Sequence, residues 1–360
     1  MSGPGTGGAG LGVGVGGTGS GLGCGSGSGV GTGGTGSVGV GGVGSGRGVG
    51  GSGSIGGMTM DLPYPRRGPG NRYGTAGRRR YGRAVLSPEV RAYYECGEED
   101  TRLSAGGGRL EWARTWELLE RHLPPPPAVL LDVGGGPGAY AVPLALAGYE
   151  VHLVDAMPLH VEQAGRAAET AAAPLASAVV GDARALPAPD ATADAVLLLG
   201  PLYHLLETAE RAAALAEARR VLRPGGVLVG VAISRFASLY DGLRQGWAAD
   251  HPGIVESGLH TGTHRNPEAL PGRFTTAHFA RPDELAAEVT GAGFELAALV
   301  AVEGPGSWLP EVDDWLDDPG RRDWLLRTIR RVEAEPSLLG ASAHVLAVGQ
   351  APEPTARRRG

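Results

Sequence analysis

The chain has 360 residues, and its 32 Lys and Arg residues against 38 Asp and Glu residues give it a formal net charge of −6. This acidic balance does not favour a polyanionic partner, so nucleic acid is not the expected ligand. No apolar run approaches the ~18 residues that a membrane-spanning helix needs, so no membrane partner is expected either.

The two cysteines lie in different parts of the chain. Cys24 lies in a glycine-rich stretch, and Cys96 lies in the part that is expected to fold. A disulfide within the fold and a cysteine metal site are therefore not expected, and a reducing cytoplasm is the predicted location.

The first 85 residues do not have the composition of a globular domain. About half of residues 1–57 are glycine, so this segment is predicted to be a disordered tail. Residues 58–85 are interpreted as a basic linker, which carries seven arginines between Arg66 and Arg83. The alternative is an RNA-binding arm, but no motif for a partner accompanies the arginines.

The remainder is predicted to form one domain at residues 86–350, followed by a disordered tail at 351–360. Two helices, at 88–96 and 109–123, are predicted within its N-terminal helical cap. The expected parts of the domain are a helical cap at 86–126, a core at 127–235, a lid or substrate insertion at 236–280 and a C-terminal part at 281–350.

Strands and helices alternate through the core. Apolar runs predict strands at 129–133, 150–154, 177–180, 195–199 and 227–233, and the segments between them predict helices at 140–147, 159–172 and 208–222. Such alternation predicts an α/β fold with a parallel sheet covered by helices on both faces. The chain then continues with a predicted helix at 282–292 and two predicted strands at 294–302 and 343–348.

A glycine-rich turn follows the first predicted strand, in the sequence Asp132-Val-Gly134-Gly-Gly136-Pro-Gly138. Ligands of open parallel sheets bind at the carboxyl ends of the strands, and glycine lets the backbone approach them closely. Asp155 ends the second predicted strand about 20 residues later, where a carboxylate can accept hydrogen bonds from ribose hydroxyls. A nucleoside-containing cofactor is therefore predicted. Gly134-x-Gly136-x-x-Ala139 also fits the dinucleotide fingerprint.

Four motifs in order distinguish these possibilities. They are the glycine turn with Asp132, the acid Asp155, Gly181-Asp182-Ala183, and the stretch Arg219-Arg-Val-Leu-Arg-Pro-Gly-Gly226. Together they resemble the class I S-adenosylmethionine-dependent methyltransferases. The resemblance implies S-adenosyl-L-methionine as cofactor and a Rossmann-like, seven-stranded, mostly parallel sheet with an antiparallel last strand.

Two flanking stretches are similar to those of bacterial proteins in the ubiquinone/menaquinone methyltransferase-like, small-molecule subgroup. One is Gly108-Arg-Leu-Glu111, and the other is Phe274-Thr-Thr-Ala-His-Phe279 with Arg281-Pro282. This resemblance does not establish a quinone as the substrate.

The resemblance also implies roles for individual residues around the cofactor. The loop with Asp132, Gly134, Gly136 and Gly138 would pass beneath the methionine portion, and Asp155 would hold the ribose diol. Asp182 would accept a hydrogen bond from the adenine amino group, with the Ala183 backbone nearby. Gly200, after the fourth predicted strand, would leave room for the methyl donor.

Three further cofactor contacts have an equally simple structural alternative. Met157 would pack on the adenine or be a core residue at a helix start. Arg109 would pair with the methionine carboxylate or be an exposed helical arginine. Tyr94 would close the cofactor site or be a half-buried aromatic residue.

Catalysis requires a general base only if the acceptor must lose a proton. Tyr203 and His204 follow the fourth predicted strand, and His204 is the first candidate for the base, with a purely structural histidine as the alternative. His264 is interpreted as a substrate contact from the insertion. His260 lies four residues before it, but Gly262 intervenes and no cysteine is near, so no metal site is predicted. The stretch 303–308 is expected to frame the acceptor pocket.

Absent motifs narrow the acceptor. Gly200-Pro-Leu-Tyr203 differs from the N/D-P-P-Y/F motif of enzymes that methylate nucleic-acid amino groups, and no Pro-Cys pair is present. A small-molecule acceptor is therefore the leading hypothesis. The alternatives are an NAD(P)-dependent oxidoreductase and a non-catalytic protein that binds S-adenosylmethionine and contacts RNA through its arginine-rich arm. The sequence leaves the oligomeric state open.

Overall fold

The computed structural model describes residues 86–353. The predictions for the glycine-rich tail and the basic linker lie outside these residues. Ala351 was assigned to a disordered tail, but it is buried and exchanges backbone hydrogen bonds with Gly225 and Gly226. The ordered domain therefore extends slightly beyond its predicted end.

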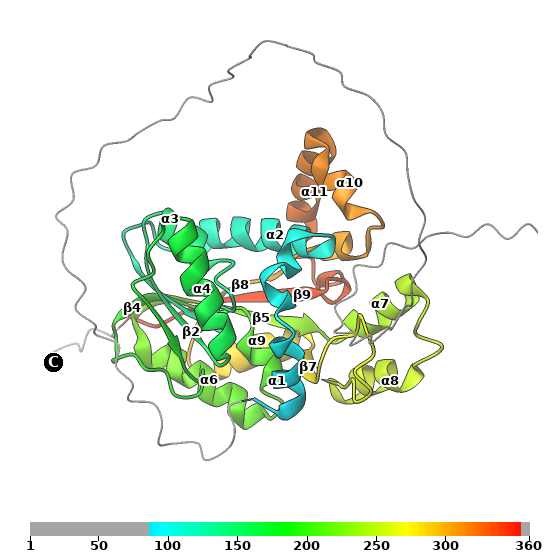
Figure 1. The fold of residues 1–360 in the computed structure, drawn as a ribbon, viewed down its shortest axis with the longest axis horizontal. Coiled ribbons are helices and arrows are strands. Elements are labelled where there is room, and N and C mark those ends of the chain that lie inside the picture. The colour runs from blue at the N-terminus through cyan, green and yellow to red at the C-terminus, as the bar shows by residue number, and fades with distance from the viewer. Residues whose placement is uncertain (1–85, 354–360) are drawn as a thin grey trace, which may run out of the picture. The chain divides into compact units, whose positions relative to one another are not determined.

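Seven strands form the main sheet, in the order β3-β2-β1-β4-β5-β9-β8 (Figure 1). Their bounds are β1 Val129–Val133, β2 Glu150–Asp155, β3 Ser177–Val180, β4 Ala193–Leu198, β5 Leu222–Ser234, β8 Glu295–Ala301 and β9 His344–Gln350. The pairs from β3 to β5 are parallel, whereas β9 runs antiparallel to both β5 and β8. The predicted mostly parallel sheet with an antiparallel last strand is confirmed.

Two short strands extend this sheet beyond the predicted seven. β7 (Ala277–Ala280) pairs in parallel with the carboxyl end of β5, and β6 (Thr263–His264) pairs antiparallel with β7. Both strands come from the segment that was predicted only as an insertion. Within residues 86–353 the sheet therefore has nine strands, and the insertion is attached to it by backbone hydrogen bonds.

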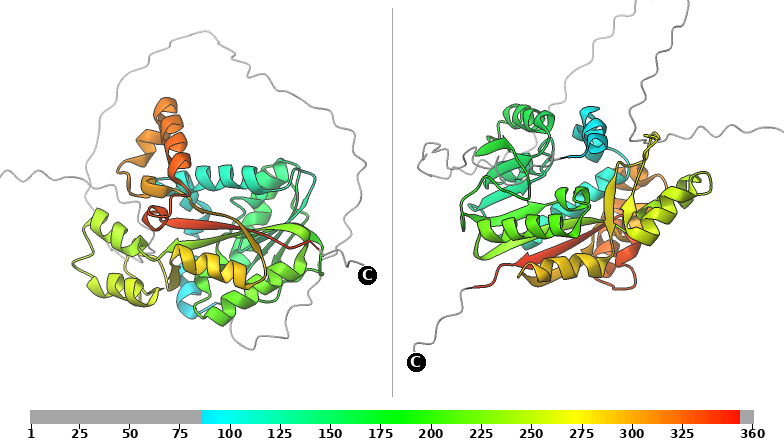
Figure 2. Two further views of the ribbon diagram at one scale, coloured as in Figure 1. Left: turned by 180° about the vertical axis from the view of Figure 1, so that it is seen from behind. Right: turned by 90° about the horizontal axis from the view of Figure 1, so that it is seen from below.

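Helices cover both faces of the sheet (Figure 2). In β1, Leu130 packs with α2 (Gly107–His122), α3 (Ala141–Leu146) and α4 (Pro158–Thr170) on one face. Leu131 and Val133 pack with α6 (Thr208–Val221) and α9 (Pro282–Gly291) on the other. Leu130 and Leu131 belong to apolar clusters on different faces because successive side chains of a strand point to opposite faces of the sheet. The predicted helical cover on both faces is confirmed.

The remaining helices surround the carboxyl ends of the parallel strands or pack beside α2. Before β1 come α1 (Pro88–Glu95), η1 (Glu98–Asp100) and η2 (Arg102–Ser104), and after β4 comes α5 (Pro201–His204). The insertion contributes α7 (Ala237–Gln245) and α8 (Pro252–Thr261), and the C-terminal part contributes η3 (Gly304–Trp308), α10 (Val312–Asp317), α11 (Pro319–Val332) and η4 (Leu339–Ala341). No helix within residues 86–353 is long and apolar enough to cross a membrane.

One predicted boundary is wrong at the start of β5. Pro224-Gly225-Gly226 was expected to separate a helix from a strand that begins at Val227, but the strand already begins at Leu222. Leu222 pairs with Ala193, and the register shifts before the pairing of Ala195 with Val227. Gly225 has a φ of +74°, so this irregular part of the strand uses glycine in a conformation that other residues avoid.

Candidate functional site

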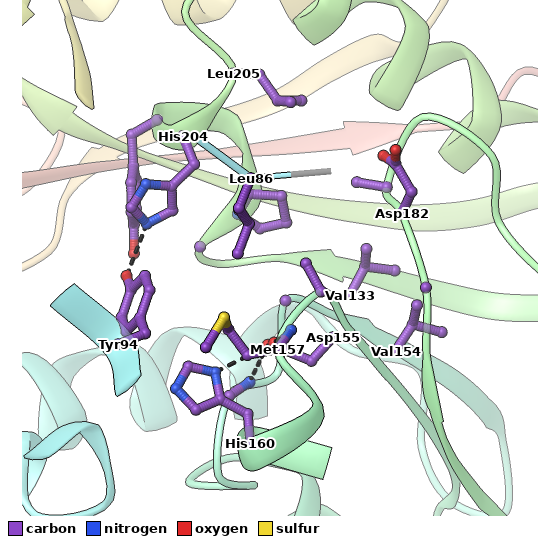
Figure 3. Close-up of a pocket in the computed structure, with 18 of the residues that line it drawn as sticks. Leu86, Tyr94, Val133, Val154, Asp155, Met157, His160, Asp182, His204 and Leu205 are labelled. Atoms are coloured by element: carbon purple, nitrogen blue, oxygen red, sulfur yellow. Dashed lines mark hydrogen bonds and ion pairs between the residues drawn. The ribbon is translucent and has the colours of Figure 1, made fainter. Parts of the chain in front are cut away.

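A groove lies at the carboxyl ends of β1, β2 and β4, and we call it the glycine-loop groove (Figure 3). Most of the residues predicted to bind a cofactor line it together: Tyr94, Gly134, Gly136, Asp155, Met157, Asp182, Ala183 and Gly200. The catalytic candidates Tyr203 and His204 line it as well. The parallel topology explains this, because it brings the ends of these strands to one edge of the sheet.

The loop after β1 depends on glycine. Gly134 and Gly136 have φ values of +70° and +55°, which L-residues rarely adopt. A Cβ atom on Gly134 would lie 2.7 Å from Pro201, whereas a Cβ atom on Gly136 would meet nothing closer than Glu99, at 4.0 Å. Gly136 therefore presents bare backbone to the groove, in space that a side chain would occupy.

Gly138 has a different role from the one expected. It does not line the glycine-loop groove, and its hypothetical Cβ atom would lie 3.3 Å from Ala164 and from Val142. Its φ of +91° again requires glycine. Gly138 therefore allows the loop to pack closely against α3 and α4 and does not itself face the ligand.

Asp155 fastens the glycine loop to the end of β2. Its carboxylate accepts hydrogen bonds from the backbone N–H groups of Gly136, at 2.9 Å, and Met157, at 2.8 Å. Nδ1 of His160 lies 3.2 Å from the same carboxylate. His160 was not predicted as a site residue, because nothing in the sequence shows that the first turn of α4 folds back onto Asp155.

Asp182 is held by a neighbour that the sequence analysis also missed. The Arg184 guanidinium binds its two carboxylate oxygens, with Nε–Oδ1 at 3.0 Å and Nη2–Oδ2 at 2.8 Å. Arg184 is buried and also pairs with Glu210 at 2.6 Å. The side chain of Asp182 is thus fixed at the rim of the groove.

A smaller space, the inner chamber, lies beside the groove. Its lining includes Asp132, Gly134, Gly136, Glu99, Arg102, Glu111, Thr115, Tyr140, Gly200, Tyr203 and His344. Asp132 is only 1% exposed, and neither of its carboxylate oxygens has a hydrogen-bond partner among residues 86–353. Burial and the negative charge of Asp155 raise the pKa of Asp132 to about 7. A cationic ligand in the inner chamber would supply the missing partner.

The arginine at this site is Arg102 and not Arg109. Arg102 binds Glu111 through both terminal nitrogens, at 2.6 and 3.0 Å, and Glu99 through Nε at 2.7 Å. Arg109, which was predicted to hold the methionine carboxylate, instead pairs with Asp313 and Asp317 of α10. That prediction is wrong, because Arg109 lines neither the groove nor the inner chamber and its guanidinium is used by the carboxylates of α10.

Tyr94 and His204 form a linked pair. The Tyr94 hydroxyl lies 2.7 Å from Nε2 of His204, and their rings meet edge to face. Burial lowers the pKa of His204 to about 4, so the ring is neutral at physiological pH. Both residues line the glycine-loop groove, in which Figure 3 shows their contact.

A large cavity of about 690 Å³ opens next to the groove and the inner chamber. Its aromatic lining residues are Tyr94, Tyr203, Trp247, Phe274, Phe279 and Trp308. Charged side chains of both signs alternate with them, including Glu99, Arg102, Asp241, Arg244, Arg273 and His344. The walls come from the helical cap, the insertion and η3. His204 does not line this cavity, whereas Tyr203 lines all three spaces.

His264 lies in the wall of the large cavity, but its ring nitrogens face the protein. Nε2 donates to the backbone carbonyl of Phe274 at 3.1 Å, so Nδ1 accepts from the Ser238 hydroxyl at 2.8 Å. The ring stacks on Phe279, and burial lowers its pKa. His264 was predicted to contact the substrate; it lines the large cavity, but both ring nitrogens are used to hold the insertion together.

Buried Glu303 pairs with the partly buried His344, which lines the inner chamber and the large cavity. Oε1 of Glu303 lies 2.6 Å from Nδ1 of His344, and Oε2 accepts from the Ser342 hydroxyl at 2.9 Å. Burial alone would lower the pKa of His344, but the carboxylates of Glu303 and Glu111 raise it to about 9. His344 was not predicted, since only the fold shows that the first residue of β9 lies at this edge of the sheet.

Glu111, Glu303 and His344 also have potential metal-ligand atoms within 4.8 Å of one another. However, both oxygens of Glu111 accept hydrogen bonds from Arg102, and both oxygens of Glu303 are engaged by His344 or Ser342. The carboxylate oxygens of this cluster therefore already have hydrogen-bond partners, and a metal ion would have to displace them.

Comparisons with known proteins identify a methyltransferase domain in this chain. The family model for a methyltransferase domain matches residues 130–226. Over 123 residues, the chain is 34% identical to a ubiquinone/menaquinone biosynthesis C-methyltransferase of Caulobacter, with 31% of this chain and 48% of that protein covered. Over 186 residues, it is 32% identical to an uncharacterized methyltransferase of Mycobacterium bovis, with 50% and 70% covered.

The chain thus spans about half the length of the Caulobacter relative and more than two thirds of the mycobacterial one. It is also similar to a solved S-adenosylmethionine-dependent methyltransferase from Methanosarcina mazei. That similarity has a TM-score of 0.47 and 19% identity, and it covers 66% of this chain and 98% of the other.

Proposed function

Because the chain belongs to the class I S-adenosylmethionine-dependent methyltransferases, we propose that it methylates a small molecule held in the large cavity. The observation that carries the proposal is the junction of the three spaces. Tyr203 and Glu99 line the glycine-loop groove, the inner chamber and the large cavity alike. A cofactor held in the first two would therefore border an acceptor held in the third.

The residues present fit S-adenosylmethionine. Gly136 leaves room for a ligand, and Asp132 is a buried carboxylate without a partner among residues 86–353. In the proposed arrangement, Asp155, Met157, Asp182 and Ala183 bind the adenosine. Asp132 accepts the cationic methionine amino group, which favours the ionised form of its carboxylate. When bound, the cofactor supplies an electrophilic methyl group on a positively charged sulfur.

The protein's own contribution to such a transfer is chiefly positioning. Tyr203 and Gly200 border the space where the methyl group would meet the acceptor. Burial raises the pKa of Tyr203, so its hydroxyl stays protonated. It can therefore take part in hydrogen bonds but does not act as a base. His204 is neutral and holds Tyr94 over the cofactor side, which makes it a positioning residue in this account.

The large cavity favours a small and partly aromatic acceptor. Its volume of about 690 Å³ falls within the ~300–1,000 Å³ usual for small-molecule sites. Its aromatic walls suit a planar apolar body, while the charged residues of both signs do not form the one-signed surface that a nucleic acid requires. The arginine-rich arm of the RNA-contacting alternative lies outside the described residues. The oxidoreductase alternative does not apply to a member of this family.

Transfer of a labelled methyl group tests the proposal. The full chain is incubated with radiolabelled S-adenosylmethionine and a bacterial extract that has been separated into small molecules, RNA and protein. We expect label in the small-molecule fraction, and we expect Asp155→Asn to abolish it because the glycine loop loses its charged anchor. Label that appears only in RNA or protein would contradict the proposed acceptor class.

A further inference from the structure

The boundary between the inner chamber and the large cavity contains one imidazole ring. Four residues line both spaces: Glu99, Arg102, Tyr203 and His344. Arg102 and Glu99 are paired with each other, and the Tyr203 hydroxyl stays protonated. His344 is thus the residue of this set whose ring can hold or release a proton, with a pKa of about 9.

The topology of the sheet places His344 there. β9 runs antiparallel to β5, so its first residue lies beside the carboxyl end of β5, where His344 pairs with Ile233. β8 runs parallel to β5, and Glu303 follows its end. Both residues therefore reach the edge of the sheet that carries the glycine loop, although Glu303 lies about 170 residues and His344 about 210 residues after that loop in the sequence.

The orientation of the ring is fixed through Glu303. This carboxylate is only 3% exposed, and it accepts hydrogen bonds from the His344 backbone N–H at 3.1 Å and from the Ser342 hydroxyl at 2.9 Å. Its other oxygen accepts a hydrogen bond from Nδ1–H of His344 at 2.6 Å. Nε2 has no hydrogen-bond partner within residues 86–353, while the side chain is 17% exposed. The free nitrogen is therefore available to a ligand.

This arrangement suits a ring that accepts a proton at Nε2. The neutral ring carries its remaining proton on Nδ1, toward Glu303, and its lone pair on Nε2. The protonated ring is stabilised by Glu303, which follows β8, and by Glu111 of α2, and it is opposed by Arg102 of η2. The resulting pKa of about 9 is close to the ~10 of a phenolic hydroxyl, so a proton can pass between the two at little cost.

Other candidates for a base at the acceptor are less suitable. His204 lines the glycine-loop groove but not the large cavity, and the Tyr94 hydroxyl occupies its Nε2. Both ring nitrogens of His264 are hydrogen-bonded inside the cavity wall. Asp241 accepts hydrogen bonds from Arg244, Gln245 and Trp247.

We propose that His344, oriented by Glu303, takes the proton from a phenolic or enolic hydroxyl group of the acceptor, so that the enzyme methylates hydroxylated planar compounds on oxygen. The proposal rests on the function proposed above. The O–H bond breaks, its electron pair stays on oxygen, and an N–H bond forms at Nε2. The oxygen takes the methyl group as the carbon–sulfur bond breaks, with that electron pair left on sulfur. The proton on Nε2 is then released to solvent, and because the pKa of His344 is about 9, the neutral ring that begins the next cycle becomes more populated as the pH rises toward 9.

The test uses 4-nitrophenol, whose anion is yellow and whose acid form is not. The full chain, saturated with S-adenosylhomocysteine, is titrated with the phenol between pH 5 and pH 10, and the spectrum of the bound probe is recorded. We expect the wild-type complex to bind the probe as its anion beside protonated His344. His344→Gln should weaken this binding about tenfold or more, because a charge-assisted hydrogen bond is lost.

A second variant separates proton transfer from simple packing. Glu303→Gln keeps the shape of the pair but removes the charge that favours the imidazolium, so binding of the anion should fall away at a lower pH than in the wild type. His260→Gln, a change at an exposed histidine of α8, should behave like the wild type.

The outcomes distinguish the two proposals. A wild-type complex that does not bind the probe as its anion, or anion binding that is unchanged in His344→Gln and Glu303→Gln, would overturn the role of His344 while leaving the methyltransferase assignment intact. Failure of the wild-type chain to bind S-adenosylhomocysteine, measured first by calorimetry, would instead refute the proposed function.

Discussion

Replacing Asp132 by asparagine should stabilise the ligand-free protein and abolish cofactor binding. Asp132 is buried, its oxygens have no partner among residues 86–353, and its pKa is raised from 3.8 to about 7. The cause is first burial and then the negative charge of Asp155. Above about pH 7 the native state therefore carries an unfavourable negative charge at Asp132. A cationic ligand that binds to this carboxylate would explain why an aspartate is present here.

The magnitude follows from the linkage between protonation and folding. A shift of about three pKa units at ~1.4 kcal/mol per unit is about 4 kcal/mol. Because the folded-state pKa of Asp132 is raised, its favourable contribution is complete below about pH 4 and is lost as the pH rises through about 7. Asparagine removes the charge but leaves an unpaired amide that costs ~1–3 kcal/mol, so a net gain of roughly 2 kcal/mol is expected at pH 8.

Urea unfolding of the full chain at pH 5, 6, 7 and 8 measures this effect. Asp132→Asn should be more stable than the wild type at pH 8, and the difference should shrink toward pH 5. S-adenosylhomocysteine at about 100 times its dissociation constant should stabilise the wild type by ~2.7 kcal/mol and leave the variant unchanged. Asp190→Asn, at a site where the side chain is 77% exposed, is the matched control and should show no such dependence on pH. A variant that is less stable than the wild type at every pH, or that still responds to the ligand, would refute the reasoning.

Three further substitutions test other parts of the structure. Arg109→Ala removes exposed ion pairs to α10 and should cost less than about 1 kcal/mol of unfolding free energy, with S-adenosylhomocysteine affinity unchanged by calorimetry; a large loss of affinity would return Arg109 to the site. Arg114→Met leaves the buried Glu333 without one of its partners and should lower stability by about 3–5 kcal/mol in urea unfolding, whereas a loss under 1 kcal/mol would contradict the buried ion pair. Gly136→Val adds a side chain in open space at a φ of +55°, so S-adenosylhomocysteine affinity should fall at least about tenfold while the chain still folds; normal affinity would show that the ligand does not approach this backbone.

The sheet could be predicted because each main strand is a continuous apolar run between turn residues. β6 and β7 could not, since two and four residues carry no reliable pattern and their pairing depends on where the insertion folds back. The start of β5 was misjudged for a related reason. Pro224 and two glycines usually end an element, but here Ala351 satisfies the backbone of Gly225 from the far end of the chain.

The glycine-loop groove was easier to predict from the sequence than the large cavity. Gly134, Gly136 and Asp155 belong to motifs that are local in sequence, so their spacing already indicates their common edge. Arg102, Glu303 and His344 come from separate elements and meet only through the topology of the sheet. His264 shows the opposite case, because its partners Ser238 and the Phe274 carbonyl could not be known before the insertion was placed.

The measurement that tests the central claim most directly is calorimetric titration of the full chain with S-adenosylhomocysteine and, separately, with NADH. The account predicts micromolar binding of S-adenosylhomocysteine that is lost in Asp155→Asn, and no binding of NADH. Binding of NADH alone, by a wild-type chain whose folding is confirmed by circular dichroism, would contradict it.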